Sequence, residues 1–103
     1  MIRHNLHMRF LEGTSDADKQ EIYDRLDGLK DHLGGILDFQ HRRNISPETH
    51  LIRGFEDMVW IDFTDAAARD TYLADSKHRA IGARIKELCG GADGLYVCDV
   101  EVS

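Results

Sequence analysis

Hydrophobic and polar residues alternate almost without interruption from Ile2 to Phe10. Successive strand side chains point to opposite faces of a sheet, so this pattern predicts a half-buried strand. The inward face carries Ile2, His4, Leu6, Met8 and Phe10, and the outward face carries Arg3, Asn5, His7 and Arg9. A buried imidazole requires a hydrogen-bond partner, so His4 is either a satisfied core histidine or a functional group.

The rest of the chain predicts three more strands and three helices. Alternation recurs at 36–42, 55–63 and 95–102, and apolar residues at helical spacing recur at 16–33, 66–73 and 76–89. In the second strand, Leu37 and Phe39 are expected to share one face. Helix N-caps are expected at Ser15, at Thr64–Asp65 and at Ser76. Glycine pairs at 34–35 and 90–91 supply the helix stops.

This order of elements, β-α-β-β-α-β, is typical of the ferredoxin-like arrangement in the α+β class. We expect one domain over residues 1–103, with the helices on one face of a four-stranded antiparallel sheet. The other face is then left open, and Trp60 lies on it. An exposed aromatic surface on a small domain requires a partner, which a second copy of the chain would supply through the same face.

Composition narrows the choice of partner and compartment. Hydrophobic residues make up 42% of the chain and the net charge is −6, which indicates a globular protein that an anionic membrane or a nucleic acid would repel. The start of the chain lacks a signal-peptide pattern, and no stretch is long and apolar enough to span a bilayer. Two isolated cysteines, Cys89 and Cys98, fit a reduced cytoplasmic protein.

No cofactor or metal site is expected. His4 and His7 are three residues apart on a strand, so they point to opposite faces and cannot chelate one ion. The chain has no glycine-rich phosphate loop, nucleophile elbow or metal-ligand signature. Nothing in the sequence supports a divalent ion at its surface carboxylates. Without a haem or flavin signature, an oxygenase ranks last among the possible activities.

Several short segments carry a family resemblance through their order and spacing. They are Arg3–His4, Arg43–Asn44–Ile45–Ser46, Gly54–Phe55, Phe63, Tyr72, His78 and Asp99. In this respect the chain resembles the Dabb family of stress-responsive dimeric α+β-barrel domains over nearly its whole length. The resemblance implies a homodimer whose two sheets close into a barrel, with a small apolar pocket between the helices and the sheet of each subunit.

Within that family the chain is distantly similar to olivetolic acid cyclase, a plant polyketide cyclase. This similarity implies that His4, Tyr72 and His78 are the catalytic groups of the pocket. The pocket wall is expected to contain Leu6, Met8, Tyr23, Leu26, Val59, Ile61, Ile81 and Asp99.

The chain also departs from the family pattern. Asp75–Ser76–Lys77 precedes His78 where the family has His-Pro-Ala, and Leu26 stands in place of a pocket tyrosine. Arg69 replaces an apolar residue on the short helix. The polyketide substrate is therefore not transferred to this chain.

Each catalytic candidate has a second, structural interpretation. In the first turn of a helix the dipole disfavours a charged imidazole, so His78 is either a neutral general base or a surface histidine. Tyr72 either donates to a developing enolate or is a core tyrosine with a satisfied hydroxyl. Asp99 either orients His4 or His78, as a carboxylate fixes a tautomer, or is a satisfied buried acid.

Two functions remain open on the sequence alone. One is cofactor-free acid/base chemistry on a small carbonyl compound, of the cyclase, lyase or isomerase type. The other is a non-catalytic dimer that binds a small molecule or serves in stress. An open cavity with converging polar groups would favour the enzyme, and a filled cavity would favour the second function.

Overall fold

The chain folds into four strands, three α-helices and two short 3₁₀ turns, and the computed structural model describes residues 1–103. In chain order the elements are β1 (Ile2–Met8), α1 (Asp16–Gly28), η1 (Leu29–Asp31), β2 (Ile36–Arg43), β3 (Asp57–Phe63), α2 (Ala66–Ala74), α3 (Ser76–Leu88), η2 (Ala92–Gly94) and β4 (Leu95–Glu101). The strands form one antiparallel sheet in the order β2-β3-β1-β4.

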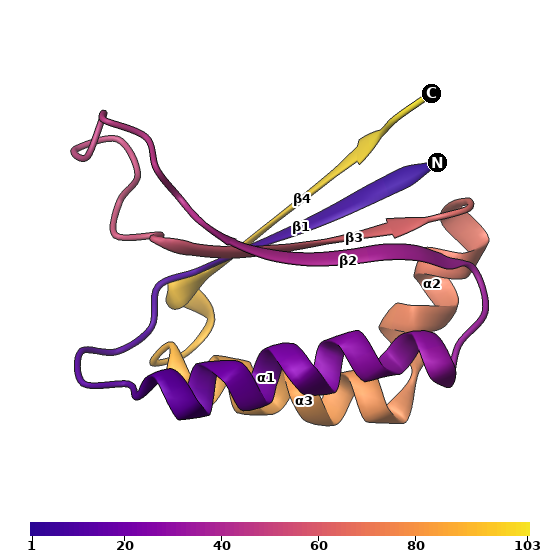
Figure 1. Cartoon of the computed structure of the whole chain (residues 1–103), viewed down its shortest axis with the longest axis horizontal. Helices are drawn as coiled ribbons and strands as arrows, with labels where there is room; N and C mark the ends of the chain where they lie inside the picture. The colour runs from indigo at the N-terminus through magenta and orange to yellow at the C-terminus, as the bar shows by residue number, and fades with distance from the viewer.

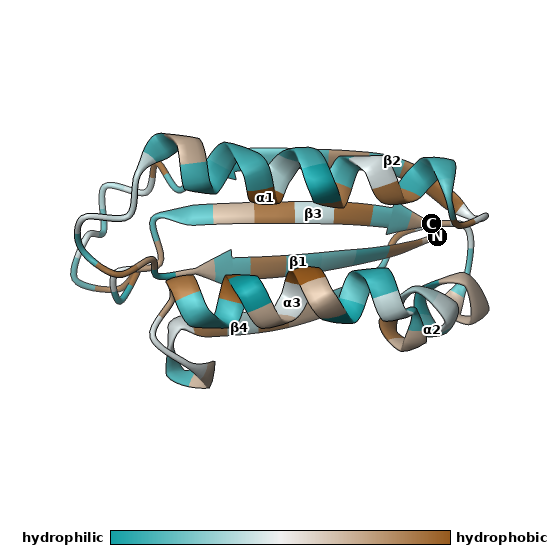
Figure 2. Ribbon diagram, turned by 90° about the horizontal axis from the view of Figure 1, so that it is seen from below, coloured by the Kyte–Doolittle hydropathy of each residue, from teal (hydrophilic) through white to brown (hydrophobic).

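The molecule has two layers, with every helix on the same face of the sheet (Figure 1). Seen from the helix side, α1 runs along β2 and β3 while α3 runs along β1 and β4 (Figure 2). The predicted α+β, ferredoxin-like arrangement is confirmed, with α2 and α3 as two separate helices. None of the helices has the length and hydropathy that a membrane-spanning segment requires.

The helix N-caps follow the predictions at two places and differ at the third. The side chains of Ser15 and Asp65 accept backbone N–H bonds and cap α1 and α2 as predicted. Ser76 is not the cap of α3, because it already lies inside the helix. Asp75 takes an extended backbone conformation there, and its carboxylate accepts a 3.0 Å bond from the backbone N–H of His78.

The prediction that Leu37 shares a face with Phe39 is wrong. The pairing of β2 with β3 is irregular between Ile36 and Asp38, so one extra residue is inserted there. A bulge of this kind shifts the alternation by one position. Ile36 and Phe39 consequently both pack against the core, while Leu37 is 57% exposed.

Three element ends differ from the sequence prediction by two residues or more. β1 ends two residues earlier than predicted, and α1 gives way to the η1 turn after Gly28. β3 begins at Asp57 rather than at Phe55. The chain turns just before it, where Arg53 and Gly54 have φ angles of 55° and 78°. These positive values mark a tight loop end that strand periodicity cannot reveal.

The hydrophobic core lies between the helices and the inner face of the sheet. Twelve buried hydrophobic residues form one cluster there. Its largest fully buried members are Phe63, Met8, Ile22, Ile61 and Val59. The strand pairing lines up Ile2 with Phe63, His4 with Ile61 and Leu6 with Val59, so the predicted inward face of β1 is the core face.

The outer face of the sheet carries no helix, and the loop between β2 and β3 rises above it at one end (Figure 1). Trp60 lies on this face between two guanidinium groups, with Arg3 and Arg42 at 5.3 and 5.5 Å from its ring. Arg3 also forms two hydrogen bonds to Asp62, at 2.8 and 3.0 Å. The indole Nε1 of Trp60 is buried without a hydrogen-bond partner.

Candidate functional site

A cavity of about 440 Å³ opens between α2, α3 and the inner face of the sheet. Ten of its sixteen lining residues are hydrophobic, which is the usual composition of a small-molecule site. The cavity brings together most of the residues expected from the sequence, namely His4, Leu6, Leu26, Val59, Ile61, Tyr72, His78 and Asp99.

Three residues expected in the pocket wall do not line this cavity. Met8 is fully buried in the core. Tyr23 stacks on His41 at 4.3 Å and faces two hollows beside α1 and β2. Ile81 faces a separate hollow between α1 and α3. Strand alternation placed Met8 near the core, and helical spacing did so for Tyr23 and Ile81, but neither pattern distinguishes the cavity wall from the packed interior.

Tyr72 lies between the two histidines of the cavity. Its ring centroid is 4.1 Å from that of His78 and 6.0 Å from that of His4, and it meets Phe63 edge-on at 5.1 Å. The tyrosine is only 2% exposed, and this burial raises the pKa of its phenol above the usual value. Tyr72 therefore remains protonated at neutral pH and can act as a hydrogen-bond donor.

His78 is held in the first turn of α3 by the Asp75 cap. Its Nδ1 is buried and has no hydrogen-bond partner. Burial is the main cause that lowers the pKa of His78. The Leu73 carbonyl opposes this effect, and the neighbouring His4 adds to it. The imidazole is consequently neutral at neutral pH, the state that a general base requires.

His4 and Asp99 face each other directly on β1 and β4. The His4 Nδ1 lies 2.6 Å from one carboxylate oxygen of Asp99, and a guanidinium nitrogen of Arg69 lies 3.0 Å from the other. An ionised carboxylate only accepts hydrogen bonds, so His4 carries its proton on Nδ1. Of the two histidines that Asp99 was expected to orient, His4 is the one in direct contact with it.

Sequence reasoning missed several lining residues. Arg79, Gly82 and Lys86 come from α3, and Leu95 and Val97 come from β4. The three α3 residues could have been found from the sequence, because a glycine in the middle of a predicted helix is flanked there by two cationic residues at helical spacing. Arg69 was noticed only as a departure from the family, and its bond to Asp99 depends on the strand register.

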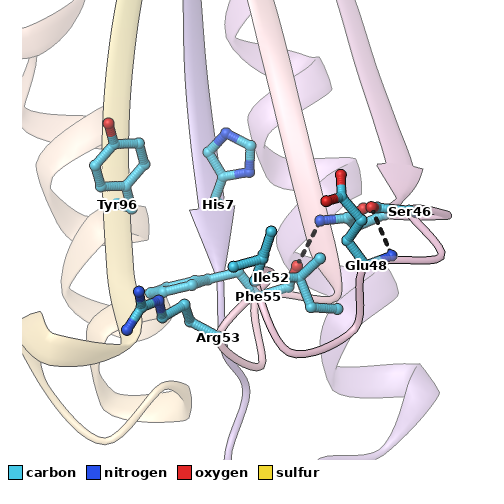
Figure 3. A pocket seen from close by; sticks show the side chains of 9 residues that line it. His7, Ser46, Glu48, Ile52, Arg53, Phe55 and Tyr96 are labelled. Atoms are coloured by element: carbon cyan, nitrogen blue, oxygen red, sulfur yellow. Dashed lines mark hydrogen bonds between the residues drawn. The ribbon is translucent and has the colours of Figure 1, made fainter.

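A second hollow of about 440 Å³ lies on the opposite face of the sheet, beneath the β2–β3 loop (Figure 3). His7 and Tyr96 stand side by side there, with ring centroids 5.7 Å apart. Asn44 donates to the Phe55 carbonyl at 3.2 Å, and the Ser46 hydroxyl accepts from a backbone N–H within the same loop at 3.1 Å. These two side chains are therefore engaged in hydrogen bonds that hold the loop together.

The described residues contain no group of three or more His, Cys, Asp and Glu positioned to hold a metal ion. The buried thiol of Cys89 also belongs to the core, and burial raises its pKa to about 11. A thiol of this kind is a poor nucleophile at neutral pH. The helix-side cavity itself is lined by two imidazoles, those of His4 and His78, and by the phenol of Tyr72.

The fold and the cavity define a ferredoxin-like α+β domain with a helix-covered pocket. The family model of the stress responsive A/B barrel domain, Dabb, matches residues 2–102. The chain belongs to the Dabb family. No curated protein matches it.

Solved structures of similar fold come from bacteria and plants. A dimeric ferredoxin-like protein of unknown function from Jannaschia sp. CCS1 is 29% identical, with 98% of each chain covered and a TM-score of 0.87. A hydroxynitrile lyase from Passiflora edulis is 13% identical, with 99% of this chain and 93% of that one covered and a TM-score of 0.82. A Dabb family protein from Mesorhizobium loti is 18% identical, with 99% and 96% covered and a TM-score of 0.70. The last two show likeness of fold alone.

Proposed function

We propose that this protein is a cofactor-free acid/base enzyme that moves a proton on a small apolar carbonyl compound bound in the helix-side cavity. The reaction is of the cyclase, lyase or isomerase type. The observation that carries the proposal is the position of Tyr72, 4.1 Å from His78 and 6.0 Å from His4 by ring centroids, inside an apolar cavity.

The first step uses His78 and Tyr72. The neutral imidazole of His78 removes a proton from the carbon beside the carbonyl group, and the C–H electron pair moves into the enolate. The Tyr72 hydroxyl donates a hydrogen bond to the carbonyl oxygen and stabilises the negative charge that develops on it. The enolate then either takes the proton back at another carbon or attacks a second carbonyl within the same substrate.

His4 supplies a second polar contact in the cavity. Asp99 accepts a hydrogen bond from Nδ1, so Nε2 is the ring nitrogen left to face the substrate. In this tautomer, His4 accepts a hydrogen bond from a hydroxyl or enol group of the substrate. The fixed ring then positions the substrate for proton removal by His78.

The proposal includes a homodimer formed through the outer face of the sheet. The Jannaschia protein, which is 29% identical, is dimeric. The outer face here carries the half-buried Trp60 and has no helix to cover it. A second copy stacked on this face would bury the indole and leave the helix-side cavities on the outside of the assembly.

A binding protein without turnover is the second candidate. It is favoured by the composition of the cavity, since ten of its sixteen lining residues are hydrophobic and an apolar ligand needs no chemistry to bind there. The hydroxynitrile lyase from Passiflora edulis supports only the view that this fold accommodates an enzyme, because the two chains are 13% identical.

Proton exchange separates the two candidates without knowledge of the natural substrate. Ketones and 1,3-diketones with apolar tails are incubated with the protein in D₂O, and deuterium uptake beside the carbonyl is followed by NMR. We expect catalysed exchange, nearly abolished in His78→Gln and reduced about 10²-fold or more in Tyr72→Phe.

The matched controls are His7→Gln and Tyr96→Phe, which change the same residue types in the hollow on the opposite face. These variants should exchange at the wild-type rate. Equal exchange by His78→Gln and the wild type would rule out the mechanism. Ligand binding without any exchange would establish the binding protein instead.

A further inference from the structure

One stripe of α3 forms part of the cavity rim and has no role in the proton transfer described above. It consists of Arg79, Gly82 and Lys86, all of which line the cavity. Their spacing of three and four residues places them on the same helix face. Arg79 and Lys86 are seven residues apart, which corresponds to about 10 Å along the helix axis, and Gly82 lies between them.

Neither of the two cations has an acidic partner, unlike seven of the thirteen lysines and arginines of the chain. Elsewhere, Arg3, Arg69 and Arg84 each form an ion pair within 4 Å. Arg79 and Lys86 are exposed, and no carboxylate lies within that distance of either. The whole chain has a net charge of −6, so two unpaired cations at one rim are a local reversal of the overall charge.

The only acid that lines the cavity does not cancel these cations. Asp99 is engaged by His4 at 2.6 Å and by Arg69 at 3.0 Å. The two cations therefore make the α3 rim locally positive, and the buried phenol of Tyr72 on the neighbouring α2 carries no charge. A cleft with unpaired charges of one sign attracts ligands of the other sign.

Gly82 keeps this part of the helix open. A Cβ added at Gly82 would meet no atom within 4 Å, and its φ angle is outside the left-handed region. Neither backbone conformation nor close packing therefore requires glycine here, although glycine inside a helix is unfavourable. Because Gly82 has no side chain, the surface of α3 between the two cations remains accessible.

We infer that the cavity binds an amphipathic carboxylate, with the carboxylate group lying over Gly82 between Arg79 and Lys86. The apolar body of the ligand then extends along Leu6 and Val97 toward Tyr72. This inference rests on the proposed use of the helix-side cavity and specifies the class of ligand that it takes. Charge-assisted hydrogen bonds to the two cations supply the selectivity for an anion over a neutral analogue.

The test compares decanoate with 1-decanol, which has the same apolar chain and no charge. Binding is measured by isothermal titration calorimetry, and the site is located from the amide shifts of labelled protein. We expect decanoate to bind at least about tenfold more tightly than decanol, with the largest amide shifts around Gly82. Acetate, which has the charge without the chain, should bind at least tenfold more weakly than decanoate.

Variants locate the selectivity. Arg79→Gln and Lys86→Gln should each weaken decanoate binding several-fold and leave decanol unchanged. Lys77→Gln is the matched control, because Lys77 is an exposed lysine of the same helix that does not line the cavity. Gly82→Leu should weaken both ligands by filling the space, and Gly82→Ala provides a smaller step if the leucine variant does not fold.

Three results would overturn the inference in different ways. Equal affinity for decanoate and decanol, with shifts at the cavity, would leave the pocket in place and remove the carboxylate site. Loss of decanoate affinity in Lys77→Gln equal to that in Lys86→Gln would indicate general surface charge. Absence of binding by both ligands would reject this inference together with the proposed use of the cavity.

Discussion

His4 donates its Nδ1 proton to Asp99, the residue directly opposite it on the neighbouring strand, across 2.6 Å. The second oxygen of Asp99 accepts from Arg69 at 3.0 Å. This chain of contacts connects β1, β4 and α2 at one end of the cavity. It fixes both the tautomer and the orientation of His4, so the ring presents Nε2 as its free nitrogen.

The first prediction concerns the acceptor in this chain of contacts. Asp99→Asn keeps the shape but has one oxygen, which cannot serve both His4 and Arg69. We expect the free energy of unfolding to fall by about 1–2 kcal/mol, since the contacts are charge-assisted but partly exposed. Urea denaturation measures this loss, and ¹⁵N NMR of the His4 ring should report a mixture of tautomers in the variant.

Asp70→Asn is the matched control for Asp99→Asn. Asp70 also pairs with Arg69, at 3.0 Å, but it is exposed and does not contact His4. Its replacement should change stability by less than about 0.5 kcal/mol and leave the His4 tautomer as in the wild type. Equal effects of the two substitutions would show that Asp99 does not orient the ring.

The second prediction follows from the lowered pKa of His78. Burial is the main cause of the shift, so the folded protein binds this proton more weakly than the unfolded chain, whose histidines titrate near 6.5. The contribution of His78 to the free energy of unfolding is therefore fully present above pH 6.5. It is lost as the pH falls from that value through the lower pKa of the folded state. NMR titration of the ring should give a midpoint below 6.5.

The rate of catalysed proton exchange should also depend on pH, and the titration of His78 should control this dependence. A general base works in its neutral form, so the rate should rise through the folded pKa of His78 and level off above it. Burial also lowers the pKa of His7 on the opposite face, so His7→Gln serves as the control for the stability profile. A rate profile that keeps its midpoint in His78→Gln would assign the base to another residue.

Local patterns in the sequence were sufficient for the fold and for part of the site. Alternation placed His4 on the core face, and helical spacing placed Tyr72 and His78 on α2 and α3. The bond between His4 and Asp99 depends on pairing between strands that are 95 residues apart, which alternation alone does not determine. The bulge at Leu37 could not be predicted either, because the hydrophobic and polar residues of β2 still alternate in the sequence when one residue is inserted in the strand pairing.

The third prediction contrasts two glycines. Gly82→Ala should raise the free energy of unfolding by about 0.5–1 kcal/mol, because the helix gains propensity and the new Cβ meets no atom within 4 Å. Gly35→Ala should lower it, because Gly35 has a φ of 82° and the new Cβ would lie 2.5 Å from that of Ala68. Urea denaturation of both variants measures the two signs, and a loss of stability in Gly82→Ala would mean that this part of α3 is packed.

The last prediction tests the outer face of the sheet as a dimer interface. Cys98 lies next to Asn5 on that face, in the edge strand β4, so Cys98→Arg would put a charge into the contact between two copies. We expect the wild type to sediment at twice its 11.7 kDa mass and the variant to sediment as a monomer. Thr71→Arg is the matched control, since it adds the same charge at an exposed position of α2.

Trp60 provides an independent readout of the same interface, because it is the only tryptophan in the chain. If the outer faces meet, dilution should shift its fluorescence to the red and increase quenching by acrylamide as the indole becomes exposed. In Cys98→Arg the fluorescence should not depend on protein concentration. A wild-type dimer whose Trp60 fluorescence is unchanged on dissociation would place the interface on another surface, because the indole would then contact the same groups in both states.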